Sequence, residues 1–90
     1  MKLVRGRRAA AMIAEKVVKN LSSLLARERG TLARVDLYAL CRAVNLTPYT
    51  LTLALEPGRE IIDESGRCWR FRGSSRGKLV FTRELLLEEG

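Results

Sequence analysis

The sequence predicts one small α+β domain, with helices in its first half and strands in its second. Apolar residues recur at three- and four-residue steps over about residues 6 to 29, 37 to 44 and 48 to 56, which is the spacing of buried helix faces. After residue 58 the pattern changes to alternation, as in CWRFR at residues 68 to 72, which indicates strands. Ninety residues, 47% of them hydrophobic, are enough for a single core, and no internal repeat divides the chain.

The first predicted helix covers about residues 6 to 29. Its apolar positions fall on one face, and charged or polar residues occupy much of the other. We expect Arg27 and Arg29 to suit the negative end of this helix and Gly30 to stop it in a left-handed conformation. Residues 31 to 35, TLARV, are too few for another helix and have the composition of a brief strand. The inward residues of the helix are Ala10, Ile13, Val17, Leu21, Leu24 and Leu25.

A tight turn separates the second and third predicted helices. Asp36 is placed to cap the second helix, which runs from about residue 37 to 44. Asn45 follows it, and asparagine tolerates the left-handed backbone that ends a helix. Thr47 then caps the third helix, and Pro48 fits a first turn that needs no amide proton. The inward residues are Leu37, Leu40, Cys41 and Val44 in the second helix, and Leu51, Ala54 and Leu55 in the third.

The second half of the chain contains two predicted strands and a candidate for a third. REIID and CWRFR are separated by residues 64 to 67, which favour a turn. Trp69 and Phe71 alternate with Arg70 and Arg72, so one face of this strand is expected in the core and the other is cationic. KLVFTR is the candidate third strand, and RELLLEE a final short helix capped by Thr82.

Positive charge is concentrated in two stretches. The formal net charge is +7, which makes nucleic acid the first candidate partner and an anionic membrane surface the second. Residues 1 to 8 carry +4 and residues 66 to 78 carry +5, neither with an acid, while all other residues together carry −2. We expect a compact body to present both stretches to a polyanion.

Other function classes have little support. Cys41 and Cys68 lack the spacing of a metal or redox site, and with no histidine in the chain we expect both to be buried and no metal to be bound. No cofactor motif or phosphate loop is present, and Asp63 and Glu64 are adjacent in a predicted turn, where we expect both to be solvated, so we expect no enzyme and no cofactor.

The sequence also gives little support to a protein that spans or binds a membrane. No apolar run approaches a membrane span, and the apolar face of the first helix is needed for the core, which favours a cytoplasmic protein. The absence of glutamine and the 30% charged residues are compatible with a thermophilic source.

Residues 8 to 72 resemble the winged helix-turn-helix family. The signature is matched by Cys41 inside the second helix, by Val44 and Leu46 beside the turn, and by Leu51 and Ala54 in the third helix. Asn45 stands where the family usually has a turn glycine. The resemblance implies a three-helix core followed by a β-hairpin wing, with residues 1 to 7 as a basic arm and residues 73 to 90 as a C-terminal extension of a single domain.

The resemblance also implies DNA binding, with the third helix in the major groove and the wing on phosphates. The outward side of the third helix has no Arg, Lys, Asn or Gln, so we expect weak sequence preference and contacts mainly to the backbone. Such a protein is a candidate transcriptional regulator or chromatin-associated factor. The expected contact residues are Arg5, Arg7 and Arg8 in the arm, Thr47, Tyr49, Thr50 and Thr52 in the third helix, and Arg67, Arg70, Arg72, Arg76 and Lys78 on or near the wing.

The competing hypothesis is a protein-interaction subunit of a replication or transcription assembly, because winged helices also serve as subunit contacts. Tyr49 and Leu53 give the outward side of the third helix an apolar centre. Leu85 and Leu86, with the leucine that follows them, are candidates either to cover that side or to join two chains as a homodimer.

Overall fold

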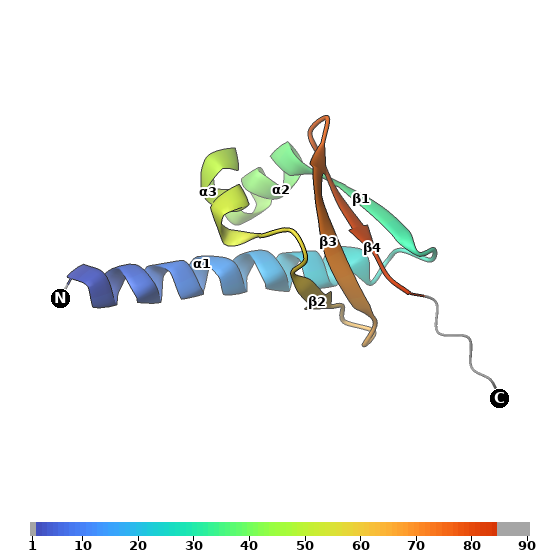
Figure 1. Ribbon diagram of the computed structural model, residues 1–90, viewed down its shortest axis with the longest axis horizontal. Helices are drawn as coiled ribbons and strands as arrows, with labels where there is room; N and C mark the ends of the chain where they lie inside the picture. The colour runs from blue at the N-terminus through green and yellow to red at the C-terminus, as the bar shows by residue number, and fades with distance from the viewer. Residues whose placement is uncertain (1, 85–90) are drawn as a thin grey trace.

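The computed structural model describes the backbone of residues 2 to 84 and the side chains of residues 11 to 84. This part of the chain forms three helices and a four-stranded antiparallel sheet, so the predicted α+β class is confirmed (Figure 1). The elements are α1 (Lys2–Leu25), β1 (Leu32–Asp36), α2 (Leu37–Val44), α3 (Pro48–Ala54), β2 (Glu60–Ile62), β3 (Cys68–Ser75) and β4 (Lys78–Thr82). Most of the final helix expected at residues 83 to 89, including Leu85 and Leu86, lies outside the described residues.

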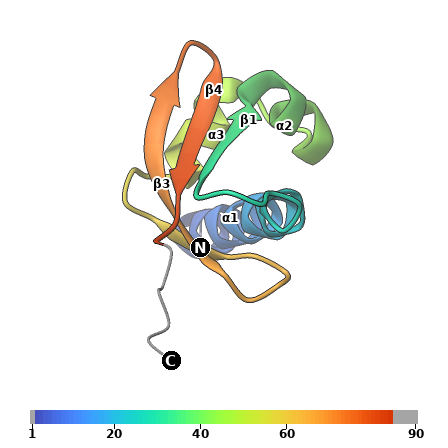
Figure 2. The same ribbon diagram turned by 90° about the vertical axis from the view of Figure 1, so that its right-hand side faces the viewer.

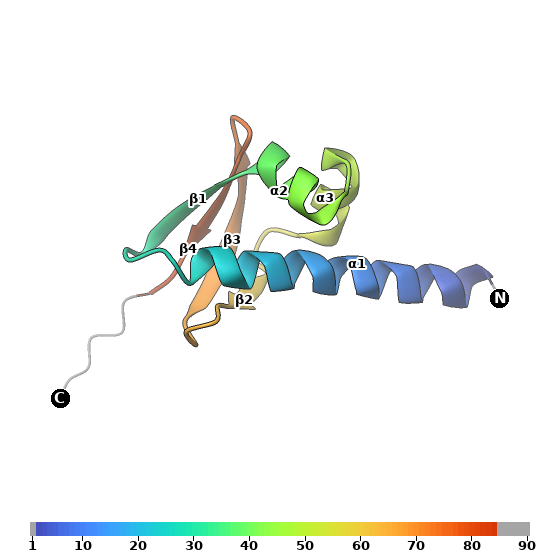
Figure 3. The same cartoon turned by 180° about the vertical axis from the view of Figure 1, so that it is seen from behind.

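Helix α1 starts earlier and ends earlier than predicted. It begins at Lys2, so the expected arm is part of a helix. It ends at Leu25, and Gly30 does not adopt a positive φ, so the predicted glycine stop is wrong. Val17 and Leu21 are fully buried, as the periodicity predicted. The first half of α1 extends past α2 and α3 to form one end of the molecule (Figure 3).

The junction of α2 and α3 is confirmed in detail. The Asp36 carboxylate accepts hydrogen bonds from the amides of Tyr38 and Ala39, at 2.9 and 3.1 Å. Asn45 has a φ of 59°, the left-handed conformation expected after the last residue of α2. Thr47 Oγ1 accepts the Thr50 amide at 3.2 Å and caps α3. These bonds are all local, which is why the sequence was sufficient to predict them.

The strand order in the sheet is β1-β4-β3-β2. The helices pack on one face of this sheet (Figures 1 and 2). On the other face, Glu60, Arg70, Thr82 and Leu32 lie side by side across the four strands. No described element covers this second face, which we call the open sheet face. Its alternating side chains remain accessible, and Leu32 and Ile62 are 46% and 55% exposed.

The long hairpin of the sheet is formed by β3 and β4, not by β2 and β3 as the sequence suggested. β4 lies between β1 and β3, and its Leu79 and Phe81 are buried in the core. Residues 78 to 82 therefore belong to the domain body, and the expected boundary at residue 72 is wrong. The candidate strand KLVFTR is thus confirmed as β4, but its place in the sheet was not predicted, because a β-bulge between Phe71 and Gly73 breaks the simple alternation of β3.

The core combines all three helices with the inner face of the sheet. Trp69 and Phe71 are buried as predicted, and the rings of Phe71 and Phe81 have centroids 5.1 Å apart. Cys41 is buried in α2, also as predicted. Cys68 is exposed, contrary to the prediction, because it precedes Trp69 on β3 and so points to the open sheet face.

Candidate functional site

The tip of the β3–β4 hairpin is fastened to the start of α2. The Leu37 amide donates to the Gly77 carbonyl at 2.9 Å, and Lys78 Nζ lies 3.5 Å from Asp36 Oδ2. A Cβ atom added at Gly77 would lie 3.5 Å from the ring of Tyr38, which shows how closely the two elements approach. The same Asp36 that caps α2 thus also contacts the hairpin, so the hairpin tip is held in a fixed position beside the helix pair.

Arg76 occupies an unfavourable backbone conformation at this tip. Arg76 and Gly77 connect β3 to β4, with φ values of 53° and 77°. Positive φ at both central residues is the type I′ pattern, in which asparagine, aspartate or glycine is preferred at the first position. A left-handed conformation costs an ordinary L-residue roughly 1 kcal/mol or more. The chain therefore has an exposed arginine at a position where asparagine, aspartate or glycine would adopt the backbone conformation at a lower cost.

The outward side of α3 is exposed as predicted, and it is more apolar than its threonines suggest. Tyr49 is 73% exposed and Leu53, one helical turn later, is 63% exposed. Two hydroxyls have partners in α3: the N-cap Thr47 Oγ1 donates to Thr50 Oγ1, and Thr52 Oγ1 donates to the Tyr49 carbonyl, at 2.9 and 2.8 Å. The most accessible part of α3 is consequently the surface of Tyr49 and Leu53.

Arg67 is placed by the structure in a fold-stabilising network at the other end of β3. Its Nη2 donates to the Ala26 carbonyl at 2.9 Å, so it caps the C-terminal end of α1. Its Nε lies 3.1 Å from Asp63 Oδ2, and its guanidinium is 6.0 Å from the centre of the Trp69 ring. These contacts leave Arg67 little freedom to bind a ligand, although the sequence reading placed it on the wing.

Asp63 is the centre of the same network, and the expectation that it is a solvated turn residue is wrong. It is only 3% exposed and accepts hydrogen bonds from the amides of Ser65 and Arg67 and from Trp69 Nε1, the last at 2.8 Å. Burial alone would raise the pKa of the Asp63 carboxyl. The hydrogen bonds from Ser65, Trp69 and Arg67 outweigh it and hold the pKa well below its ordinary value.

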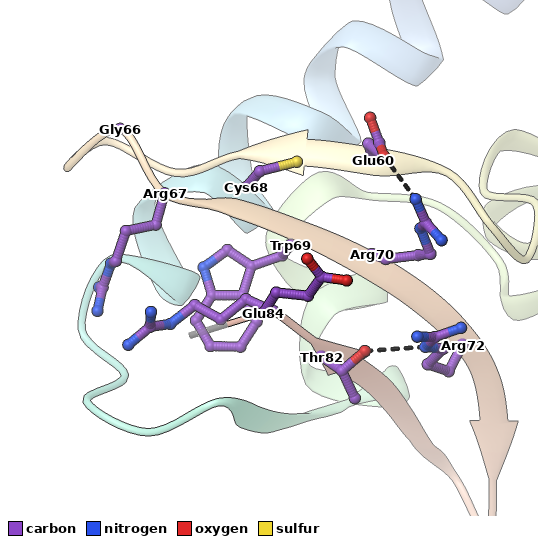
Figure 4. Close-up of a pocket in the computed structure, with 10 residues that line it drawn as sticks. Glu60, Gly66, Arg67, Cys68, Trp69, Arg70, Arg72, Thr82 and Glu84 are labelled. Atoms are coloured by element: carbon purple, nitrogen blue, oxygen red, sulfur yellow. Dashed lines mark hydrogen bonds and ion pairs between the residues drawn. The ribbon is translucent and has the colours of Figure 1, made fainter. Parts of the chain in front are cut away.

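Arg70 and Arg72 lie on the open sheet face, turned away from α3. Arg70 Nη2 donates to Glu60 Oε2 at 2.7 Å across the β2–β3 pair, and Arg72 Nε donates to Thr82 Oγ1 at 2.8 Å (Figure 4). The Glu60 partner raises the pKa of Arg70. The two arginines border a groove of about 680 Å³ whose lining also includes Arg67, Arg83 and Glu84. Sequence reasoning missed Glu60, Thr82, Arg83 and Glu84 as neighbours of these arginines.

The two basic stretches do not form one surface, contrary to the expectation from composition. Residues 2 to 8 lie at the end of α1 that projects beyond α2 and α3, whereas β2, β3 and β4 lie toward the other end of the molecule (Figures 1 and 3). The stretch from 66 to 78 is itself divided, since Arg67 and Arg76 flank opposite ends of β3. Carboxylates from elsewhere in the sequence lie next to three of its cations: Asp63, Glu60 and Asp36.

Among the described residues, no three side chains of the metal-binding types cluster together. None of the helices in the described range is long and apolar enough to cross a membrane.

No protein-family model, no curated protein and no solved structure matches the chain.

Proposed function

We propose that this chain is a winged-helix DNA-binding protein that contacts the phosphate backbone of a duplex with α3 and with the tip of the β3–β4 hairpin. The arrangement of elements is compatible with a winged helix: a tightly joined helix pair is followed by a hairpin fixed beside it. The proposed contact surface consists of Thr47, Tyr49, Thr50, Thr52, Arg76 and Lys78.

The observation that carries the proposal is the left-handed conformation of Arg76. Backbone strain in a folded protein is often associated with a function that requires the strained residue. A long cation at the most protruding point of a hairpin can reach a phosphate that the body of the protein does not touch. The net charge of +7 adds a general attraction to polyanions.

Weak sequence preference follows from the composition of the same surface. None of its side chains is Asn or Gln, and its only cations lie in the hairpin, not on α3. Phosphate contacts position a protein on DNA without reading the bases. The protein is therefore expected to bind unrelated duplexes with similar affinity.

The test compares Arg76→Asn with Arg27→Asn in binding two labelled duplexes of unrelated sequence. Each substitution removes one positive charge from an exposed residue. Arg27, however, lies in the turn after α1, away from the hairpin tip. We expect Arg76→Asn to weaken binding to both duplexes by about tenfold, the loss of one charge-assisted hydrogen bond. Equal effects of the two variants would show that only overall charge matters and would contradict the proposed site.

A second candidate function is supported by the exposed pair Tyr49 and Leu53. Aromatic and large apolar side chains on a surface helix are typical of the centre of a protein interface. In this alternative, α3 docks onto a partner protein. The two functions predict different effects of salt. Affinity for DNA should fall as the salt concentration rises, whereas an apolar protein interface releases no counterions and should show no such fall.

A further inference from the structure

The groove on the open sheet face is separate from the proposed DNA contacts. Arg70 and Arg72 lie on one side of it and Arg67 on the other, with the Glu84 carboxylate between them (Figure 4). We call this feature the arginine groove. Its volume of about 680 Å³ is in the range of ligand and peptide sites. It faces away from α3, so a duplex on α3 leaves it accessible.

The arginine groove contains hydrogen-bond donors that the described residues do not satisfy. A guanidinium group has five N–H donors. Arg72 uses only its Nε, toward Thr82, and Arg70 uses one Nη2 contact, toward Glu60. Among the described residues, no carboxylate lies within ion-pair distance of Arg72 or Arg83. The groove therefore favours a ligand rich in anionic acceptors.

The floor and wall of the groove are held rigidly. Arg83 donates to the Gly30 and Arg29 carbonyls, at 3.0 and 3.3 Å, and its guanidinium lies 5.4 Å from the centre of the Trp69 ring. Trp69 itself is fully buried beneath it. A rigid wall lowers the entropic cost of binding, because little has to be ordered on the protein side.

We propose that the occupant of the arginine groove is an extended acidic peptide segment of another protein. The segment lies along β3 and places two acidic side chains, two residues apart, against Arg70 and Arg72. Alternate side chains of an extended chain repeat at about 6.6 Å, which suits two acidic side chains placed against Arg70 and Arg72, since both arginines reach the open sheet face on either side of Phe71. Glu60 and Glu84 in the lining disfavour a duplex, which is charged at every step, more than a segment in which neutral residues separate the acidic side chains.

The experiment measures binding of labelled peptides to the full chain by fluorescence anisotropy. The probe contains Glu-Thr-Glu-Thr-Glu, and a second peptide spreads the same glutamates to every third position. A third peptide replaces glutamate with glutamine. We expect the first peptide to bind about tenfold more tightly than the second, and the third not to bind, because each misplaced carboxylate loses a charge-assisted hydrogen bond.

Variants of the chain locate the peptide. Arg72→Ala should weaken binding of the first peptide about tenfold, whereas Arg42→Ala, which removes an exposed cation from α2 on the other side of the sheet, should leave it unchanged. Glu84→Gln should strengthen binding, since it removes a carboxylate from the centre of the groove. Arg76→Asn should not affect peptide binding, so failure of this proposal is distinguishable from failure of the proposed DNA contact.

Three results would overturn the proposal. The first is equal affinity for both glutamate spacings, which would indicate unspecific attraction. The second is unchanged peptide binding by Arg72→Ala. The third is strong peptide binding only after Glu88→Gln and Glu89→Gln are introduced together, which would mean that the acidic C-terminal segment of the chain itself is the natural occupant.

Discussion

At the scale of single residues, the arginines of the stretch 66 to 78 have separate functions, although they are close in sequence. Arg67 caps α1 and binds Asp63, Arg70 pairs with Glu60, and Arg76 protrudes from the hairpin tip. The sequence showed that the stretch contains no acid but not which acids the sheet would bring beside it. Asp63 precedes Arg67 by four residues, while Glu60 reaches Arg70 only through the pairing of β2 with β3.

The strain at Arg76 leads to a prediction about stability. Arg76→Asn should raise the free energy of unfolding by up to about 1 kcal/mol, because asparagine adopts the left-handed conformation more easily. Urea denaturation followed by circular dichroism measures this difference. A variant that is both less stable than the wild type and unchanged in DNA binding would remove the argument that function selects arginine at this position.

The Asp63 network leads to a prediction about acid stability. The folded-state pKa of Asp63 lies below its ordinary value, so its contribution is fully present above pH 3.8 and is lost as the pH falls below that value toward the folded-state pKa. Asp63→Asn should reduce the free energy of unfolding at pH 7 by about 2 to 3 kcal/mol, because buried donors lose a charged acceptor. The variant should also lose part of the acid dependence below pH 3.8.

Urea denaturation at several pH values checks both effects. A matched control is Glu64→Gln, since Glu64 is the exposed neighbour of Asp63 in the same turn. If Asp63→Asn and Glu64→Gln lowered the free energy of unfolding by the same small amount, the Asp63 network would not stabilise the fold as described.

At the scale of elements, the predictability of each boundary depended on where its hydrogen-bond partners lie in the sequence. The turn between α2 and α3 was predicted residue by residue, because Asp36, Asn45 and Thr47 act on their immediate neighbours. The end of α1 was not predicted correctly, because the group that binds the carbonyls there is the Arg67 side chain, which is 41 residues away from Ala26. The hairpin was misassigned because neither the bulge nor the pairing of β1 with β4 has a local signal.

Helix α3 provides a test of its own exposed side. Leu53→Glu should leave the free energy of unfolding within about 0.5 kcal/mol of wild type, since Leu53 is 63% exposed. It should weaken duplex binding by adding a negative charge beside the proposed phosphate contacts. Leu55→Glu is the matched control, and with Leu55 only 2% exposed it should unfold the domain.

Duplex affinity of Leu53→Glu also separates the two candidate functions. Weaker duplex binding with intact folding supports α3 as part of the DNA contact. Unchanged duplex binding by the folded variant would exclude Leu53 from that contact and favour the docking of α3 onto a partner protein.

At the scale of the whole molecule, the sheet separates two surfaces with different chemistry. One side carries α3 and the hairpin tip, and the other carries the arginine groove. The charge distribution along the sequence predicted a polyanion partner, but folding distributes the cations over several surfaces and places carboxylates beside three of them. The DNA contact inferred here is correspondingly smaller than the sequence suggested. We expect duplex affinity to depend on a few phosphate contacts near the hairpin.

The most direct test of this account is the affinity for one duplex, measured over a series of salt concentrations. Each phosphate contact contributes about −0.9 to the slope of log affinity against log salt concentration, so contacts from Arg76 and Lys78 alone predict a slope of about −2. Arg76→Asn should reduce its magnitude by about 1. An affinity that does not change with salt would contradict the proposal that this protein binds the DNA backbone.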